Sequence, residues 1–234
     1  MSPFISEFVG SSILLLLGNG VVANVVLNKT KGQGSGWIVI TFGWAMAVFV
    51  GVYASAAASG AHLNAAITIG LAVKNNDWSN VPLYLAAQML GSMFGSFLVW
   101  VCYRQHFEET ESKDLKLAVF CTAPAIRNNF NNFMSELIGT FMLMMGVLFL
   151  VSSESKLGSL DALPVALLVF AIGLSLGGST GYAINPSRDL GPRLMHFILP
   201  IKDKRDSDWG YSWIPVLAPF TGAVLAVFVF QFLQ

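Results

Sequence analysis

Long uncharged stretches constrain the fold of this chain more than any other feature of its sequence. The longest runs from Gly32 to Val73, 42 residues without an Asp, Glu, Lys or Arg. Charged residues make up 11% of the chain, whereas a soluble domain carries about 25% because its surface must face water. We therefore expect an integral membrane protein of the all-α class.

The uncharged stretches predict six transmembrane helices. A helix needs about 20 mostly apolar residues to cross a bilayer. The expected spans lie near residues 5–27, 36–57, 81–104, 132–152, 162–180 and 212–233. Aromatic residues near the ends of these spans, where such side chains anchor a helix at the membrane surface, are Trp37, Tyr84, Tyr211 and Trp213.

Two segments do not fit simple spans. Residues 59–66 read Ser-Gly-Ala-His-Leu-Asn-Ala-Ala, a poor helix interior, and precede a short apolar helix at residues 67–73. Residues 181–187 read Gly-Tyr-Ala-Ile-Asn-Pro-Ser and precede a short helix at residues 188–197. Irregular backbone at membrane depth is tolerated only where it is buried in protein or lines a water-filled cavity. Both segments are therefore candidates for re-entrant half-helices.

The two halves of the chain match each other. Residues 4–11 match residues 133–140, and residues 59–66 match residues 180–187. Three spans per repeat place the copies in opposite orientations, and inverted repeats of this kind put the functional site at the membrane midplane. We predict a single domain, 1–234, with repeat one at about 1–105, a connecting loop at about 106–130 and repeat two at about 131–234.

These features together resemble the aquaporin (major intrinsic protein) family over nearly the whole chain, and the glycerol facilitator branch within it. The resemblance rests on six spans, a Glu in spans one and four, and the paired motifs at residues 60–66 and 185–189. It implies a right-handed bundle of six spans and two half-helices. It also implies a homotetramer, a cell-membrane location and cytoplasmic termini. The implied function is a passive channel for small uncharged solutes, chiefly glycerol, with water and similar small polyols, excluding protons and ions.

The chain departs from the usual motif of this family. Where the family usually has Asn-Pro-Ala twice, this sequence has Asn64-Ala65-Ala66 and Asn185-Pro186-Ser187. Pro in the first helical turn is pre-organising rather than essential, and Ala is an excellent helix former. We therefore expect an intact fold, with these six residues at the central constriction.

The half-helices suggest how such a pore would work. Helix N-termini carry unpaired N–H donors and a partial positive charge. With the amides of Asn64 and Asn185, they would orient a hydroxyl group and repel cations and hydronium ions. Backbone carbonyls expected to line the path belong to Gly60, Ala61, His62, Leu63, Gly181 and Ala183.

By resemblance, the narrowest point is an aromatic/arginine ring, formed here by Trp44, Gly173, Tyr182 and Arg188. A charge such as Arg188 at membrane depth is costly and is a functional candidate, and its guanidinium can donate to two hydroxyls at once. Trp44 and Tyr182 would face the carbon side of a polyol. Gly173 leaves room that a water-selective member fills with His. Tyr182 replaces the Phe of the glycerol facilitator.

Three acidic side chains are expected to support this pore. Glu7 and Glu136 occupy matched positions in the repeats, and the resemblance implies that they tie the re-entrant loops by hydrogen bonds. Asp189 would hold the second half-helix through its N-terminal N–H groups.

One sequence rule conflicts with the expected orientation. Cytoplasmic loops usually carry the excess of Lys and Arg. Cytoplasmic termini leave only Lys74 and Lys156 inside, and place nine basic residues outside: Lys29, Lys31, Arg104, Lys113, Lys116, Arg127, Lys202, Lys204 and Arg205. We follow the resemblance, because the order of the half-helices is fixed by the fold.

Other functions remain open at this point. A pore mainly for water, or for small neutral acids such as lactic acid, would use the same ring. A coupled secondary transporter also uses inverted repeats, but the expected path offers Arg188 without a carboxylate facing it. The formal net charge of zero disfavours nucleic-acid binding. Cys102, Cys121 and the three His show no metal-ligand or catalytic spacing, so we expect no metal, no cofactor and no enzymatic activity.

Overall fold

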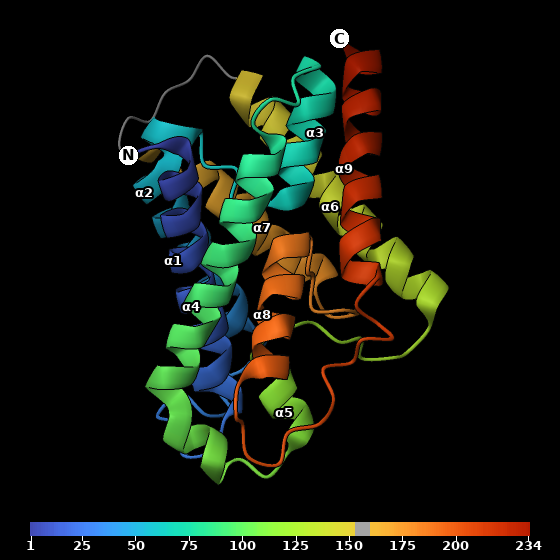
Figure 1. Ribbon diagram of the computed structural model, residues 1–234. Coiled ribbons are helices and arrows are strands. Elements are labelled where there is room, and N and C mark those ends of the chain that lie inside the picture. Colours follow the sequence, from blue (N-terminus) through green and yellow to red (C-terminus); the bar gives the residue numbers. More distant parts are fainter. Residues whose placement is uncertain (153–159) are drawn as a thin grey trace.

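The protein is a helical bundle whose two chain ends lie at the same end of the molecule (Figure 1). The structure is a computed structural model that describes residues 1–152 and 160–234. Within these ranges the chain forms no β-strand. Its helices are α1 (Pro3–Val26), α2 (Trp37–Ser59), α3 (Ala65–Asn75), α4 (Val81–Glu109), α5 (Lys113–Ala118), α6 (Asn129–Ser152), α7 (Leu163–Leu176), α8 (Pro186–Ile198) and α9 (Ile214–Leu233).

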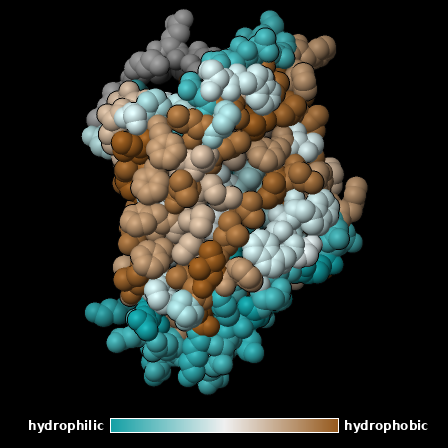
Figure 2. Space-filling model, viewed as in Figure 1, coloured by the Kyte–Doolittle hydropathy of each residue, from teal (hydrophilic) through white to brown (hydrophobic). Residues whose placement is uncertain are grey.

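Five of these helices are long and apolar enough to cross a membrane: α1, α2, α4, α6 and α9. On the face shown in Figure 2, hydrophobic residues cover much of the middle of the molecule, and hydrophilic residues gather at its ends. The fifth expected span, near residues 162–180, is shorter than predicted. Helix α7 has 14 residues, a length of about 21 Å at 1.5 Å per residue, and it ends at Leu176, where Gly177 and Gly178 follow.

The two half-helices begin where their motifs place them. Asn64 and Asn185 are extended N-cap residues, and α3 and α8 start at the next residue. Both helices are longer than the sequence predicts, reaching Asn75 and Ile198. One helix was not predicted: α5 lies in the connecting segment, and the Ser112 hydroxyl accepts a hydrogen bond from Leu115 N–H at its start. Lys156 lies outside the described residues.

The packing repeats between the two halves. Helix α1 packs on α4, and α6 packs on α9. A Cβ on Gly91 of α4 would lie 2.4 Å from the carbonyl oxygen of Phe8, and one on Gly222 of α9 would lie 2.3 Å from that of Leu137. Phe8 and Leu137 directly follow the matched Glu residues, so each repeat uses a glycine at the same place to bring its first and last helices together.

The half-helices connect the two repeats. Helix α3 of the first half packs on α9 of the second, and α8 packs on α4 of the first. Helices α2 and α7 also pack on each other. The N-termini of α3 and α8 therefore meet inside the bundle.

Candidate functional site

The two loops that precede the half-helices have the same backbone. In the first, Gly60, Ala61 and Leu63 have φ of 78°, 52° and 48°; in the second, Gly181, Tyr182 and Ile184 have φ of 85°, 38° and 42°. Left-handed backbone is unfavourable for residues with a side chain, at a cost of about 1–3 kcal/mol each. Four non-glycine residues in this conformation require surroundings that hold them.

A buried carboxylate holds each loop. The carboxylate of Glu7 accepts hydrogen bonds from the consecutive N–H groups of residues 62 and 63, at 2.9 and 2.8 Å. The carboxylate of Glu136 accepts from those of residues 183 and 184, both at 2.9 Å. Both side chains are inaccessible to solvent. Each carboxylate thus fixes the two residues before a half-helix cap.

The first carboxylate has further partners. The Ser59 hydroxyl donates to Glu7 at 2.6 Å, and the Gln88 side-chain amide donates to it at 2.8 Å. The same amide nitrogen donates to the Thr68 hydroxyl at 2.9 Å. Sequence reasoning missed Gln88, although an amide side chain within an apolar span was a signal for it.

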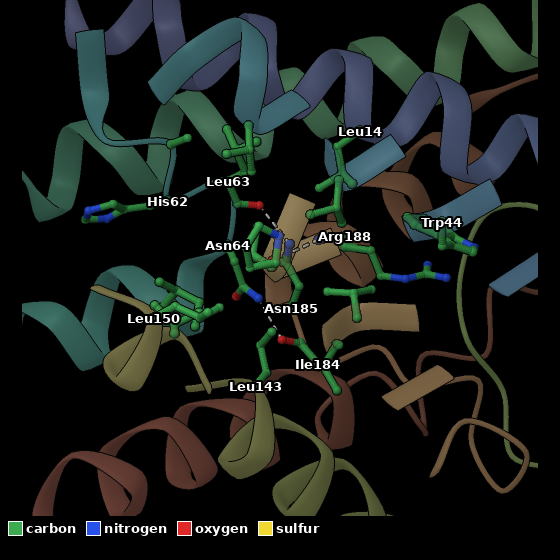
Figure 3. A pocket seen from close by; sticks show the side chains of 18 of the residues that line it. Leu14, Trp44, His62, Leu63, Asn64, Leu143, Leu150, Ile184, Asn185 and Arg188 are labelled. Carbon is green, nitrogen blue, oxygen red and sulfur yellow. Dashed lines mark hydrogen bonds between the residues drawn. The ribbon is translucent and has the colours of Figure 1, made fainter. Parts of the chain in front are cut away.

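The two Asn side chains cross between the loops (Figure 3). Asn64 Nδ2 donates to the carbonyl of Ile184, and Asn185 Nδ2 donates to that of Leu63, both at 2.8 Å. Their Oδ1 atoms cap the half-helices: Asn64 accepts from the N–H of residue 66 at 2.8 Å, and Asn185 from those of residues 187 and 188 at 3.1 and 3.3 Å. An amide carries two N–H donors, so each has a second one beyond these bonds.

A cavity of about 450 Å³, the main cavity, runs along this arrangement. In Figure 3 the Asn pair lies between His62 on one side and Arg188 with Trp44 on the other. The predicted site residues among its lining are Trp44, Gly60, Ala61, His62, Leu63, Asn64, Tyr182, Ala183, Asn185 and Arg188. Residues 65, 66, 186 and 187, and Gly181, do not line it.

A second cavity of about 240 Å³, the small cavity, adjoins the first. The two share three lining residues, Trp44, Tyr182 and Arg188. Gly181 lines the small cavity only. The three shared side chains therefore form the boundary between the two cavities.

The boundary residues present a cation, two aromatic faces and unsatisfied polar atoms. The guanidinium carbon of Arg188 lies 4.2 Å from the ring centroid of Trp44, within cation–π range. Arg188 Nη1 and Tyr182 Oη are buried and have no hydrogen-bond partner in the described part of the chain. Buried polar groups normally have partners, so both atoms retain unused hydrogen-bonding capacity at the boundary.

Gly173 lies behind this boundary rather than in it, since it lines neither cavity. A Cβ at this position would lie 2.9 Å from Cζ and 3.1 Å from Oη of Tyr182. The room that the sequence suggested at Gly173 is thus filled by the Tyr182 ring. A His side chain could not enter without displacing that ring.

Asp189 has partners other than the expected helix N–H groups. Its carboxylate accepts from the N–H and hydroxyl of Thr122 at 2.7 and 2.6 Å, and from Arg193 Nε at 2.8 Å. Arg193 Nη2 in turn donates to the Thr122 carbonyl at 2.9 Å. This fully buried ion pair therefore fastens the connecting segment to α8.

The described chain contains no group of three His, Cys, Asp or Glu side chains placed to hold a metal ion. His62 Nδ1 lies 3.1 Å from the Thr68 hydroxyl. Cys102 is exposed and Cys121 is buried, and neither forms a disulfide.

Comparison with known proteins places this geometry in a defined group. The family model described as "Major intrinsic protein" matches residues 1–230. A probable glycerol uptake facilitator protein of Thermotoga maritima is 53% identical over 234 residues, all of both chains. A D/L-lactic acid transporter of Lactiplantibacillus plantarum is 40% identical, covering 95% of this chain and 93% of the relative. The X-ray structure of the aquaglyceroporin from Plasmodium falciparum superposes with a TM-score of 0.86 at 36% identity, covering 97% and 94% of the two chains.

Proposed function

This chain belongs to the major intrinsic protein family, and from that premise we propose that it is a passive membrane channel for small uncharged solutes, chiefly glycerol, with water and similar polyols. The observation that carries the proposal is the boundary of Trp44, Tyr182 and Arg188 between two cavities. It offers a donor and aromatic faces to one small molecule, which suits a solute with hydroxyls on one side and carbon on the other.

In this proposal the boundary is the selectivity filter, with Gly173 as the surface against which Tyr182 packs. Arg188 donates to the hydroxyls of glycerol, while Trp44 contacts its carbon–hydrogen side. The fixed positive charge of Arg188 repels cations. Selection therefore combines shape, hydrogen bonding and charge at one place.

The Asn pair forms the central constriction. The N-termini of α3 and α8 meet there with their partial positive charges, and the spare N–H donors of Asn64 and Asn185 bind the oxygen of a passing molecule. Water oriented by two such donors cannot accept and pass on a proton, and cations are repelled. Residues 65, 66, 186 and 187 form the first turns that hold the Asn caps, the loop carbonyls provide acceptors along the path, and Glu7, Glu136 and Asp189 support the loops.

Neutral hydroxy acids such as lactic acid are a second candidate class of solute. The Tyr182 hydroxyl can accept a hydrogen bond from the O–H of an undissociated carboxyl group while Arg188 donates to the carbonyl oxygen of that group. Similarity to a relative named as a D/L-lactic acid transporter favours the same class.

Light scattering from proteoliposomes tests the proposal. In inward gradients of glycerol we expect fast, non-saturating re-swelling that falls when Trp44 or Arg188 is replaced by Ala. A gradient of an impermeant osmolyte measures the water permeability, and a gradient of lactic acid at acidic pH measures the lactic acid permeability. Fast water efflux without glycerol entry would indicate a water channel instead of a glycerol channel. Glycerol flux that saturates with concentration would indicate a carrier.

We also propose a homotetramer in the cell membrane with cytoplasmic termini, as in the resembled family. The end opposite the termini carries ion pairs that neutralise much of its basic charge: Lys29 with Glu109, Arg104 with Glu108, Arg127 with Asp208, and Arg205 with Asp114. In a Cys102→Ser background, Ser112→Cys should react with an impermeant thiol reagent from outside the cell, and Ser79→Cys should not. The reverse labelling pattern would show that the termini lie outside the cell.

The molecular mass of the purified protein, corrected for bound detergent, tests whether it is a tetramer.

A further inference from the structure

The Tyr182 ring packs against two glycines at the C-terminal end of α7, Gly173 and Gly177. A Cβ on Gly177 would lie 2.4 Å from Tyr182 Cδ1, and one on Gly173 would lie 2.9 Å from its Cζ. These glycines are four residues apart, one helical turn. The aromatic ring therefore lies against the backbone of the last turn of α7, closer than any side chain there would allow.

Trp37 covers the same ring from another direction. The rings of Trp37 and Tyr182 pack edge to face, with centroids 5.8 Å apart and an interplanar angle of 80°. The indole Nε1 donates to the carbonyl oxygen of Gly173 at 3.0 Å. A Cβ on Gly177 would also lie 2.9 Å from Trp37 Cζ2. Trp37 thus contacts both the ring and the glycine surface that supports it.

Neither Trp37 nor Gly177 belongs to the boundary between the cavities. Both line the small cavity alone. Their effect on a solute at the boundary is therefore indirect and passes through Tyr182, which lines both cavities beside Arg188.

We propose that Trp37 and Gly177 are specificity-determining positioning residues, which set the size of solute admitted by fixing the Tyr182 ring. The inference rests on the proposed channel function. If the ring moves toward Trp44 and Arg188, the opening narrows. If the ring is released toward the space that Trp37 occupies, the opening widens and the discrimination against larger polyols falls.

The competing interpretation is that Trp37 is an ordinary interfacial anchor. It is 38% exposed and begins a transmembrane helix, as expected for an anchor. Trp213 offers a matched control, because it is 41% exposed at the start of α9 and packs on Phe133 away from both cavities. An anchor affects insertion and stability without changing the ranking of solutes.

Gly178 supplies the matched control for Gly177. It also lines the small cavity, but a Cβ at this position meets no atom within 4 Å. Gly178→Ala therefore adds the same methyl group one residue away without touching Tyr182.

The test measures permeability to water, glycerol and a five-carbon polyol in proteoliposomes, for Trp37→Leu, Trp37→Phe, Gly177→Ala and the controls Trp213→Leu and Gly178→Ala. For Trp37→Leu we expect the ratio of five-carbon polyol to glycerol permeability to rise roughly two- to tenfold, the factor expected for loss of an aromatic pair. Trp37→Phe keeps a ring and loses the N–H donor. Its permeability ratio should therefore lie between those of Trp37→Leu and the unmodified protein. Gly177→Ala should lower the ratio of glycerol to water permeability.

A second background separates positioning from general damage. In a Tyr182→Ala channel the Trp37 substitutions should no longer change either ratio, because the side chain through which they act is gone. Ratios that stay unchanged in an intact Tyr182 channel, or that change equally in both backgrounds or in the controls, overturn the inference. If the unmodified protein did not conduct glycerol, the proposed function would be overturned instead. The water permeability of the Trp37 variants would then still report on the width of the opening.

Discussion

The two half-helix loops share a backbone but differ in the side chains that they present. Both place left-handed residues at the same positions, both are held by a buried carboxylate, and their caps exchange hydrogen bonds. Three residues after the cap, however, the first loop carries Ile67 and the second Arg188; three residues before it they carry Ala61 and Tyr182. In the proposed channel the shared part forms the centre of the pore, and the differing part accounts for selectivity on one side only.

The loops also differ in what fastens them. The first depends on Glu7, which binds Gln88 and Ser59 in addition to the loop. The second has a separate clamp, because Asp189 and Arg193 fasten α8 to Thr122. Support is concentrated in one group in the first loop and divided between two in the second.

The largest expected effect comes from removing the carboxylates. Glu7→Ala leaves the N–H groups of residues 62 and 63 without an acceptor and takes one acceptor from Gln88. Glu136→Ala leaves the N–H groups of residues 183 and 184 without an acceptor and takes one from the Thr180 side chain. Each buried donor without a partner costs about 1–3 kcal/mol, so we expect a loss of roughly 2–6 kcal/mol for either variant, larger for Glu7. Thermal unfolding in detergent shows which of the two Ala variants is less stable.

Glu→Gln at each position is the control, since one carbonyl oxygen remains to accept. It should unfold at a temperature between those of the Ala variant and the unmodified protein. If Glu136→Ala were the less stable of the two Ala variants, the argument from concentrated support would be wrong.

The next largest effect should come from Arg188, the charged boundary residue whose counterpart in the first half is Ile67. Arg188→Ala removes a cationic donor, and hydrogen bonds to charged groups contribute about 1.5–3 kcal/mol. We expect the ratio of glycerol to five-carbon polyol permeability to fall at least about tenfold and cation leakage to rise. Ile67→Ala, at the matched position, should produce a smaller change and no leakage. Unchanged solute ranking in Arg188→Ala would refute the filter assignment.

A smaller effect is expected from the Tyr182 hydroxyl, which Ala61 in the first loop lacks. Tyr182→Phe removes one hydrogen-bonding group and keeps the ring on its glycine surface. Because a neutral hydrogen bond contributes about 0.5–1.5 kcal/mol, lactic acid permeability at acidic pH should fall roughly two- to tenfold, while glycerol permeability changes less. Equal effects on both solutes would show that the hydroxyl acts through the width of the opening and does not bind acid.

Much of this architecture is encoded locally and could be predicted. The half-helices begin at Asn caps because Asn is a favoured N-cap residue, and the repeat places two such caps in one pore. The contacts that fix the loops could not be predicted in this way. Trp37 and Gly173 are 136 residues apart, Gln88 and Glu7 are 81 apart, and Thr122 and Asp189 are 67 apart. The sequence also shows that Gly173 lacks a side chain but not that the Tyr182 ring fills the space.

The smallest expected effect concerns the first residue of each half-helix. Ala65 has an N–H and donates it to Asn185 Oδ1 at 3.4 Å, beyond the usual range of N–H···O distances, whereas Pro186 has none to offer Asn64. Ala65→Pro removes this long hydrogen bond and gains a favoured first-turn residue. We therefore expect the free energy of unfolding to change by less than about 1 kcal/mol and glycerol flux to remain near its original level.

The reciprocal variant, Pro186→Ala, tests the same asymmetry from the other side. It should lower stability by about 0.4–1 kcal/mol, because the unfolded chain regains freedom that Pro had removed. Thermal unfolding and glycerol re-swelling of the single and double variants measure both changes. If Ala65→Pro abolished glycerol flux while Pro186→Ala did not, the long bond to Asn185 would be essential. The centre of the pore would then depend on a hydrogen bond that only one of its two half-helices makes.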